Sequence, residues 1–362
     1  MVIYLANLIS IPLWYFLLRF FQPNLQRVQN TVVAIVCVQM VVIAGLRGLT
    51  VGTDTMTYSD IFWSVDSLPW TGLFSYYIEP GYSLLAKIIS FLSKNYSVML
   101  FVSAAISLWG IRNFINKTCK NKCFALFLFI TIGYFSSMMN VMRQYLALVF
   151  ILNVYVCVIK RDKWYKTALN ILIACLFHKS AILISAVIVI YYILYLSEMK
   201  YARQIKLIVM SVALILVVFL KQIISLLSFL DYEYLQTGAA FEVGLFSPTF
   251  IMKLIFIAVC LYIEIKCKDK IADDDLHLLR FFRYIIIVSC LLNIGSVSFN
   301  MLTRLNIYFT IVNIAWIPNI IELLPIKPKW PMIICTCAVF TATYLLDLFG
   351  GGNDIVPYVF MK

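Results

Sequence analysis

Three arginines occupy similar places in this sequence, each beside the end of a long apolar segment: Arg47, Arg143 and Arg304. A guanidinium group is planar and stays charged at any relevant pH, and its forked N–H groups bind two phosphate oxygens at once. Several such groups at one membrane surface predict a site for an anionic diphosphate headgroup whose hydrocarbon tail stays in the bilayer.

Polar residues accompany these arginines at helical spacing. Asn140, Arg143 and Gln144 stand at positions i, i+3 and i+4, which would place them on one face of a helix. Asn300, Arg304 and Tyr308 follow one another at four-residue intervals and predict the same arrangement. We expect a supporting set of residues around the arginines that comprises Tyr58, Tyr82, Asn140, Gln144, Ser180 and Asn300.

Three further residues could deprotonate an incoming hydroxyl group: His178, Glu79 and Asp54. The sequence does not choose among them. Arginines can stabilise the charge of a departing diphosphate, so neither a metal nor another cofactor is expected. Simpler interpretations stay open, because an arginine near a helix end can extend to lipid headgroups, a histidine can cap a helix, and loop carboxylates can be solvated.

Composition indicates the elements that must position these residues. Of 362 residues, 63% are hydrophobic and 13% are charged, whereas a soluble domain is about half apolar and about one quarter charged. Apolar runs long enough to cross the hydrocarbon recur along the chain without alternation, so the sequence predicts an all-α, polytopic transmembrane bundle. The predicted spans are twelve: 2–20, 31–46, 97–111, 123–138, 139–159, 166–177, 181–197, 207–230, 249–265, 281–297, 301–321 and 331–348.

One more apolar stretch, 82–91, is too short to cross alone, and we expect a re-entrant or interfacial helix there. The first apolar segment lacks a basic start and a small-residue cleavage site, so we expect a permanent span and no signal peptide.

The positive charges predict the orientation of the bundle. Twenty of the 29 lysines and arginines fall in six segments that alternate with non-basic ones, which predicts that these six face the cytoplasm and that both termini lie outside. Segments 47–81 and 231–247 would then be outer-face loops of a single membrane domain, 1–362. The net charge of +12 comes from these short clusters, and no continuous basic face for nucleic acid is expected.

Several motifs together resemble the EpsG family of Wzy-type polymerases, which build O-antigen, capsule and exopolysaccharide. The motifs are Arg47…Gly52-x-Asp54…Tyr58, Glu79-Pro80-Gly81-Tyr82, Asn140-x-x-Arg143-Gln144 and Phe177-His178-x-Ser180-Ala181. The resemblance implies an inverting glycosyltransferase on the outer face of the bacterial inner membrane. It implies a polyprenyl-diphosphate-linked glycan as donor, a lipid-linked repeat unit as acceptor, and a flippase and a chain-length regulator as partners.

Other functions remain possible on the sequence alone. A flippase for lipid-linked oligosaccharide would need charged groups through the middle of the membrane and usually shows repeats, neither of which is evident. A ligase that moves finished O-antigen to a lipid core would use similar groups. A membrane acyltransferase would need a more deeply placed histidine.

Overall fold

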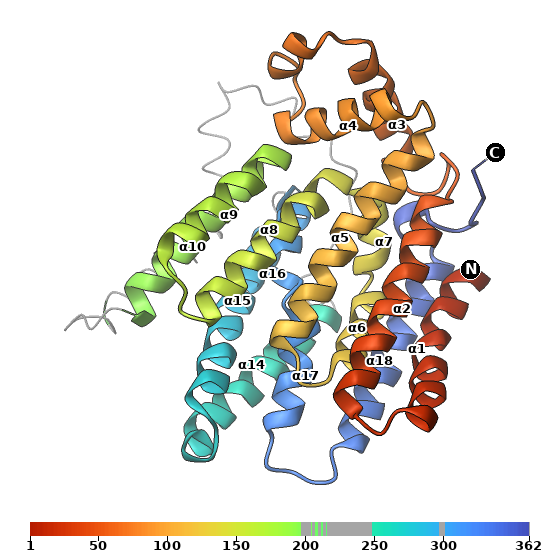
Figure 1. The fold of residues 1–362 in the computed structure, drawn as a ribbon. Coiled ribbons are helices and arrows are strands. Elements are labelled where there is room, and N and C mark those ends of the chain that lie inside the picture. Colours follow the sequence, from red (N-terminus) through yellow and green to blue (C-terminus); the bar gives the residue numbers. More distant parts are fainter. Residues whose placement is uncertain are drawn as a thin grey trace. The chain divides into compact units, whose positions relative to one another are not determined.

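The computed structural model describes residues 1–196, 204, 207–208, 211–212, 215, 248–296 and 301–361 (Figure 1). The described part is helical and contains no strand, only one isolated bridge between Arg47 and Phe360. The predicted all-α class is therefore confirmed. The chain forms two compact units, Met1–Ile182 with Ile326–Lys362, and Leu183–Pro325. That both belong to a single membrane domain stays a prediction.

Eight helices form the frame of the first unit. Asparagine side chains cap three of them, since Asn24, Asn95 and Asn121 each accept a hydrogen bond from a backbone N–H of the first turn. Helix α8 packs against α5 and α9, and α2 packs against α1 and α5. The helices are α1 (Val2–Phe21), α2 (Leu25–Gly45), α5 (Tyr96–Thr118), α6 (Lys122–Thr131), α7 (Tyr134–Asn140), α8 (Met142–Ile159), α9 (Trp164–Phe177) and α18 (Trp330–Phe349).

The second unit contains α10 (Leu183–Tyr191), α14 (Pro248–Lys266), α15 (Asp273–Ser296), α16 (Met301–Thr310) and α17 (Asn313–Leu323). An ion pair joins α14 to α15, because the guanidinium of Arg283 donates to both oxygens of Glu264 at 2.7 and 2.8 Å. The predicted span 207–230 lies outside the described residues, except for a few isolated positions. The predicted outer loop 231–247 lies entirely outside them.

Six described helices are long and apolar enough to cross a membrane, or seven if α6 and α7 form one bent span. The number twelve stays a prediction. Two predicted spans are broken in the structure. The chain bends by 56° between α6 and α7, where Gly133 takes a positive φ of 88°, and span 301–321 divides into α16 and α17.

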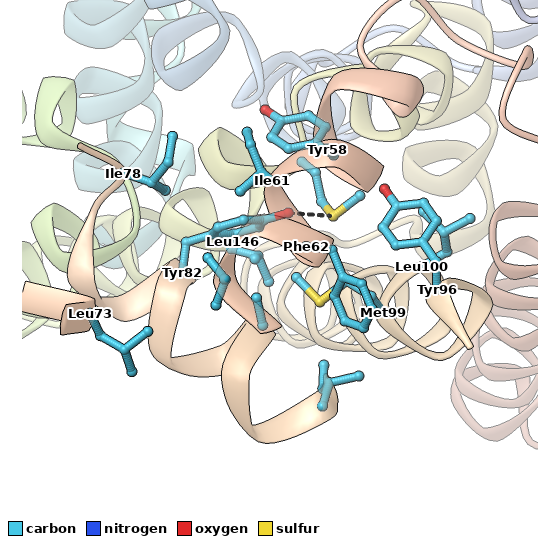
Figure 2. Packing of buried hydrophobic residues seen from close by; sticks show 14 residues of the cluster. Tyr58, Ile61, Phe62, Leu73, Ile78, Tyr82, Tyr96, Met99, Leu100 and Leu146 are labelled. Carbon is cyan, nitrogen blue, oxygen red and sulfur yellow. Dashed lines mark hydrogen bonds between the residues drawn. The ribbon is translucent and has the colours of Figure 1, made fainter. Parts of the chain in front are cut away.

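The segment predicted as a loop, 47–81, contains helices. Helix α3 (Thr55–Ser67) and the short η1 (Trp70–Phe74) precede α4 (Pro80–Leu92), and they pack on α5 and α8 through a buried cluster (Figure 2). In this cluster Phe62 contacts Tyr96, and the hydroxyl of Tyr82 points to the sulfur of Met142 at 3.9 Å. With 13 residues, α4 is about 20 Å long and too short to cross about 30 Å of hydrocarbon. This agrees with the prediction that 82–91 does not span.

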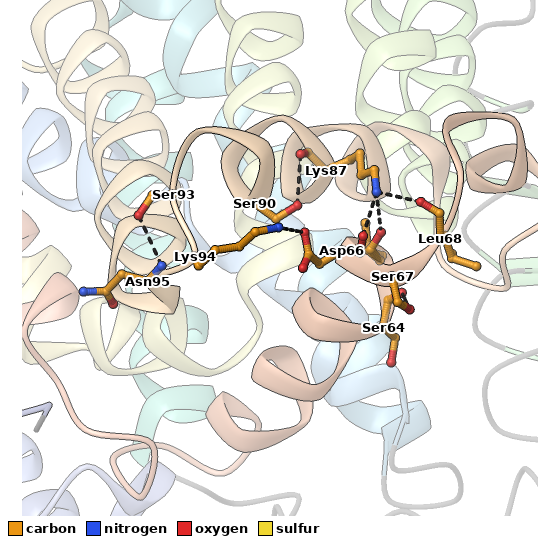
Figure 3. Close-up of polar contacts among 10 residues, drawn as sticks. Ser64, Asp66, Ser67, Leu68, Lys87, Ser90, Ser93, Lys94 and Asn95 are labelled. Carbon is orange, nitrogen blue, oxygen red and sulfur yellow. Dashed lines mark hydrogen bonds and ion pairs between the residues drawn. The ribbon is translucent and has the colours of Figure 1, made fainter.

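A buried lysine fastens α4 to the end of α3. The ammonium group of Lys87 donates to the carbonyl oxygens of Val65, Asp66 and Leu68 at 3.3, 2.8 and 2.6 Å (Figure 3). These carbonyls lie at the C-terminus of α3, where a positive charge also meets the negative end of the helix dipole. Lys94 adds an exposed ion pair with Asp66.

Candidate active site

Three segments of the first unit meet at the carboxylate of Glu79. Its Oε2 accepts a hydrogen bond from Nη1 of Arg143 at 2.5 Å, and its Oε1 lies 3.2 Å from Nδ1 of His178. The backbone N–H of Lys179 also donates to Oε1, at 3.2 Å. Glu79 is 5% exposed. The structure thus brings together three residues that the sequence nominated separately, from before α4, the start of α8 and the end of α9.

Local sequence explains how α4 and α9 deliver two of these residues. Glu79 directly precedes Pro80, whose fixed φ suits the first position of a helix. His178 ends α9, and its backbone N–H donates to the carbonyl of Ala174 at 3.0 Å. Between them, Gly81 allows the two helices to touch, because a Cβ at this position would lie 2.7 Å from the carbonyl oxygen of Leu176. This close approach sets the distance between Glu79 and His178.

Arg143 lies in the first turn of α8 and above an aromatic ring. Its guanidinium carbon is 5.8 Å from the centre of the ring of Tyr58, within the range of a cation–π contact. Tyr58 packs in turn on Tyr82, with ring centres 5.8 Å apart. Burial raises the pKa of Tyr58, so the phenol stays protonated and supports the arginine without serving as a base. The side chain of Arg143 is 24% exposed, so a ligand at the protein surface can contact it.

The charge state of Glu79 determines which proton His178 carries. Burial alone would raise the pKa of Glu79, but the hydrogen bond from His178 and the charge of Arg143 outweigh it and hold the pKa at about 2. The carboxylate is therefore ionised at neutral pH and can only accept hydrogen bonds. It follows that Nδ1 of His178 is the donor, and that Nε2 carries the lone pair whenever the ring is neutral. The imidazole is 28% exposed.

Arg47 is not part of this group, and its side chain is bound by backbone carbonyls. Its side chain is buried and donates to the carbonyl oxygens of Ala44 at 2.5 Å and Met139 at 2.8 Å. Arg47 thereby ties the end of α2 to the end of α7, four residues before Arg143. That it binds a diphosphate stays a prediction, and its contacts favour a positioning role.

Asn140 and Arg143 do not share a helix face, contrary to the prediction from their spacing. Asn140 is the last residue of α7, and Val141 leaves the helical conformation with φ −91° and ψ 60° before α8 begins. The amide nitrogen of Asn140 instead donates to the backbone oxygen of Asn353 at 2.9 Å and to its side-chain oxygen at 3.1 Å. Asn140 therefore belongs to the frame of the site.

A tail after α18 completes this frame, and its role was not predicted from the sequence. The backbone N–H of Gly52 donates to the carbonyl of Asp354 at 2.8 Å, and the N–H of Gly48 donates to that of Val359 at 2.7 Å. Gly52 has φ +96°, and a Cβ there would lie 2.4 Å from Oδ1 of Asn140, so only glycine fits. The run Gly350–Asp354, which is rich in glycine and polar residues, is a weak signal for a turn at the start of this tail.

The remaining predicted residues are distributed over both units. Asp54 precedes α3 by one residue and lies one turn before Tyr58, Gln144 is buried in α8, and Ser180 lies in the short helix η2 (Lys179–Ile182) that follows His178. Arg304 is an exposed residue of α16 in the second unit, one turn before the buried Tyr308. Asn300 lies outside the described residues.

The arrangement in the first unit offers a base beside a cation. Nε2 of His178 can take a proton, Glu79 orients the ring, and Arg143 presents positive charge next to it. Within the described ranges, no three His, Cys, Asp or Glu side chains form a group that could hold a metal ion.

Comparison with known proteins gives one match. The sequence model of the EpsG family matches residues 30–360, which include every residue of the site described above. No curated protein and no solved structure matches the chain.

Proposed function

We propose that this chain, which belongs to the EpsG family, is a polysaccharide polymerase of the Wzy type. In this proposal it transfers glycan from a polyprenyl-diphosphate donor to a lipid-linked repeat unit on the outer face of the bacterial inner membrane. The observation that carries the proposal is the contact of Glu79 with both Arg143 and His178. A base and a diphosphate-binding cation side by side are what an inverting glycosyl transfer requires.

In the proposed reaction, the oxygen of the acceptor hydroxyl bonds to the anomeric carbon of the donor sugar. At the same time, Nε2 of His178 accepts the proton of that hydroxyl. The bond from that carbon to the diphosphate oxygen breaks, and polyprenyl diphosphate leaves with the electron pair. Glu79 stabilises the imidazolium that forms, as a carboxylate beside a catalytic histidine does. Arg143 stabilises the charge on the leaving group, so the proposal needs no metal.

His178 is the preferred base among the three candidates. A carboxylate with a pKa of about 2 has little tendency to take a proton near neutral pH, which argues against Glu79. Asp54 remains an alternative on the neighbouring segment. Diphosphate binding by Arg304, a residue of the second unit, is proposed from the sequence alone.

The charges of the first unit support the proposed orientation. Glu79, His178 and the tail residues lie at one end of its helices, whereas the basic segments 112–122 and 160–166 lie at the other end, where the backbone N–H of Lys122 donates to Gln29. Basic loops stay in the cytoplasm, so the site would face outside. Twelve spans with both termini outside fit this orientation.

A flippase or ligase is the second candidate, and the position of the site weighs against a flippase. A transporter would place its charged groups near the middle of the membrane, but Glu79, Arg143 and His178 gather where helices begin or end. A ligase would use the same chemistry on a different acceptor. The final products in cells therefore distinguish the three functions.

The test is Arg143→Lys in cells, with Arg19→Lys as matched control, since Arg19 donates to the exposed carbonyls of Gln22 and Pro23 at the other end of the helices. Lysine keeps the charge but loses the planar fork. We expect Arg143→Lys to leave single repeat units on the acceptor at normal protein level, and the control to make long chains. Absence of any capped acceptor would indicate a flippase, long unligated chains would indicate a ligase, and normal polymer would exclude a role for Arg143.

A further inference from the structure

Helix α4 carries its polar and apolar residues on unexpected sides. A helix at the surface of a water-soluble protein buries its apolar stripe and exposes its polar one. In α4, the side chains of Ser83, Lys87 and Ser90 are buried. Large apolar side chains are exposed instead, with exposed fractions of 45%, 42%, 74% and 75% for Leu84, Ile88, Phe91 and Leu92.

This inverted pattern has a structural cause. Lys87 faces inward because its ammonium group holds three carbonyls at the end of α3, and the hydroxyl of Ser90 donates to the carbonyl of Lys87 at 3.0 Å (Figure 3). The polar face of α4 is thus turned into the protein, where Lys87 and Ser90 are hydrogen-bonded. The outward face is left with hydrocarbon alone, which is suited to contact with lipid chains.

The apolar face of α4 leads to the proposed active site. Helix α4 begins directly after Glu79, and its Gly81 packs closely against Leu176 in the last turn of α9. Helix α9 also exposes apolar side chains toward its end, Leu172 at 63% and Leu176 at 43%, and it stops directly before His178. Both helices therefore carry exposed apolar side chains and have one end at the group formed by Glu79, Arg143 and His178.

We infer that the isoprenoid chain of the lipid-linked substrate lies along this apolar edge of α4 and α9, so that the substrate reaches the site sideways from the membrane. The inference rests on the proposed function and specifies where that substrate binds. The edge is hydrocarbon along its length and ends at a partly exposed arginine, which matches a molecule with an apolar chain and an anionic diphosphate head. Ordinary membrane lipid would meet the same apolar face but would not depend on its connection to the arginine.

Photo-crosslinking in membranes tests this placement. A benzophenone amino acid replaces Ile88 or Phe91 on the edge, and Val38 on α2 serves as control because it is an equally apolar residue that is 64% exposed. The probe is polyprenyl-diphosphate-linked repeat unit that carries a tritiated sugar. We expect labelled protein from positions 88 and 91 and little from position 38. Equal labelling at all three positions would mean contact with bulk hydrocarbon only and would overturn the inference.

Kinetics provide a second measurement on the same edge. Ile88→Glu should raise KM for the lipid-linked substrate by roughly tenfold, the loss expected for one apolar contact, with kcat little changed. Val38→Glu is the matched control for a charge placed on a lipid-exposed face. Unchanged KM together with no crosslinking at 88 and 91, in membranes that still polymerise, would refute the edge and leave the polymerase proposal intact. If wild-type membranes supplied with the substrate make no polymer, both proposals fail.

Discussion

Replacement of Glu79 by glutamine removes one charge from the centre of the site at almost no change in volume. The amide oxygen of glutamine can accept a hydrogen bond from either Arg143 or His178. The amide NH2 group then faces the N–H donor of the residue that is left, and two donors cannot bond to each other. Glutamine can also accept from the backbone N–H of Lys179. The substitution therefore removes the carboxylate's role as joint acceptor and leaves the local fold in place.

The magnitude follows from two features of the structure. The pKa of Glu79 falls from 4.5 to about 2, which corresponds to a preference of about 3 kcal/mol for the carboxylate in this environment. One charge-assisted hydrogen bond contributes about 1.5–3 kcal/mol. If one such bond is lost in the transition state, the rate of chain extension should fall by roughly 10- to 150-fold.

Extension of a labelled lipid-linked repeat unit in membrane vesicles measures this rate, with the amount of inserted protein as normalisation. Asp66→Asn is the control, because it removes the exposed pair with Lys94, which should contribute little. A rate for Glu79→Gln within about twofold of wild type would show that Glu79 serves only to begin α4, and the catalytic reasoning would be wrong.

The same pKa predicts how the rate depends on pH. Because the folded pKa is depressed, the contribution of Glu79 is complete above about pH 4.5 and is lost only as the pH falls toward about 2. Any change in rate between about pH 5 and pH 8 must then come from another group, and it should persist in Asp66→Asn. An infrared band of a protonated carboxyl group that appears between about pH 8 and pH 5 in wild type and is absent in Glu79→Gln would contradict this assignment of charge.

Three more predictions concern the frame and its orientation. Gly81→Ala should lower the free energy of unfolding by about 1–3 kcal/mol, because the added methyl group would meet the backbone of Leu176. Gly72→Ala is the control and should be tolerated, because the nearest atom to its added Cβ lies at 3.4 Å. Thermal unfolding in detergent compares the two variants. Lys87→Met should cost about 1–3 kcal/mol in the same assay, because three carbonyl groups lose their donor, and an unchanged midpoint would refute the clamp. In a background without the ten native cysteines, an impermeant thiol reagent should label Thr71→Cys and spare Lys120→Cys, and the reverse would invert the proposed topology.

The candidate residues of the site were accessible from sequence, but their contacts were not. Glu79, Arg143 and His178 were conspicuous because charged or titratable groups beside apolar segments are rare. The sequence could not show that Glu79 pairs with both others, since this depends on the approach of α4 to α9 at Gly81. It therefore left the choice of base open.

Helix breaks account for the clearest error. Spacing predicted one face for Asn140 and Arg143, but spacing has that meaning only within a continuous helix. The break at Val141 is not marked by proline or glycine, and the bend at Gly133 lies about two turns earlier. Lys87 is a charged residue within an apolar stretch, but its partners are backbone carbonyls of α3, which no side-chain pattern reveals.

The contacts of the tail determine when the site can form during synthesis. Asn353 meets Asn140 across 213 residues of chain, and Ile355 accepts a hydrogen bond from Tyr4 across 351. The early helices can enter the membrane while the rest of the chain is still being translated, but Gly52 and Asn140 receive their partners only after residues 353–354 leave the ribosome. Such non-local closure is slow compared with the formation of a helix. A chain that stalls before residue 353 therefore holds Glu79, Arg143 and His178 in an open frame, and the frame closes only after the tail has been translated.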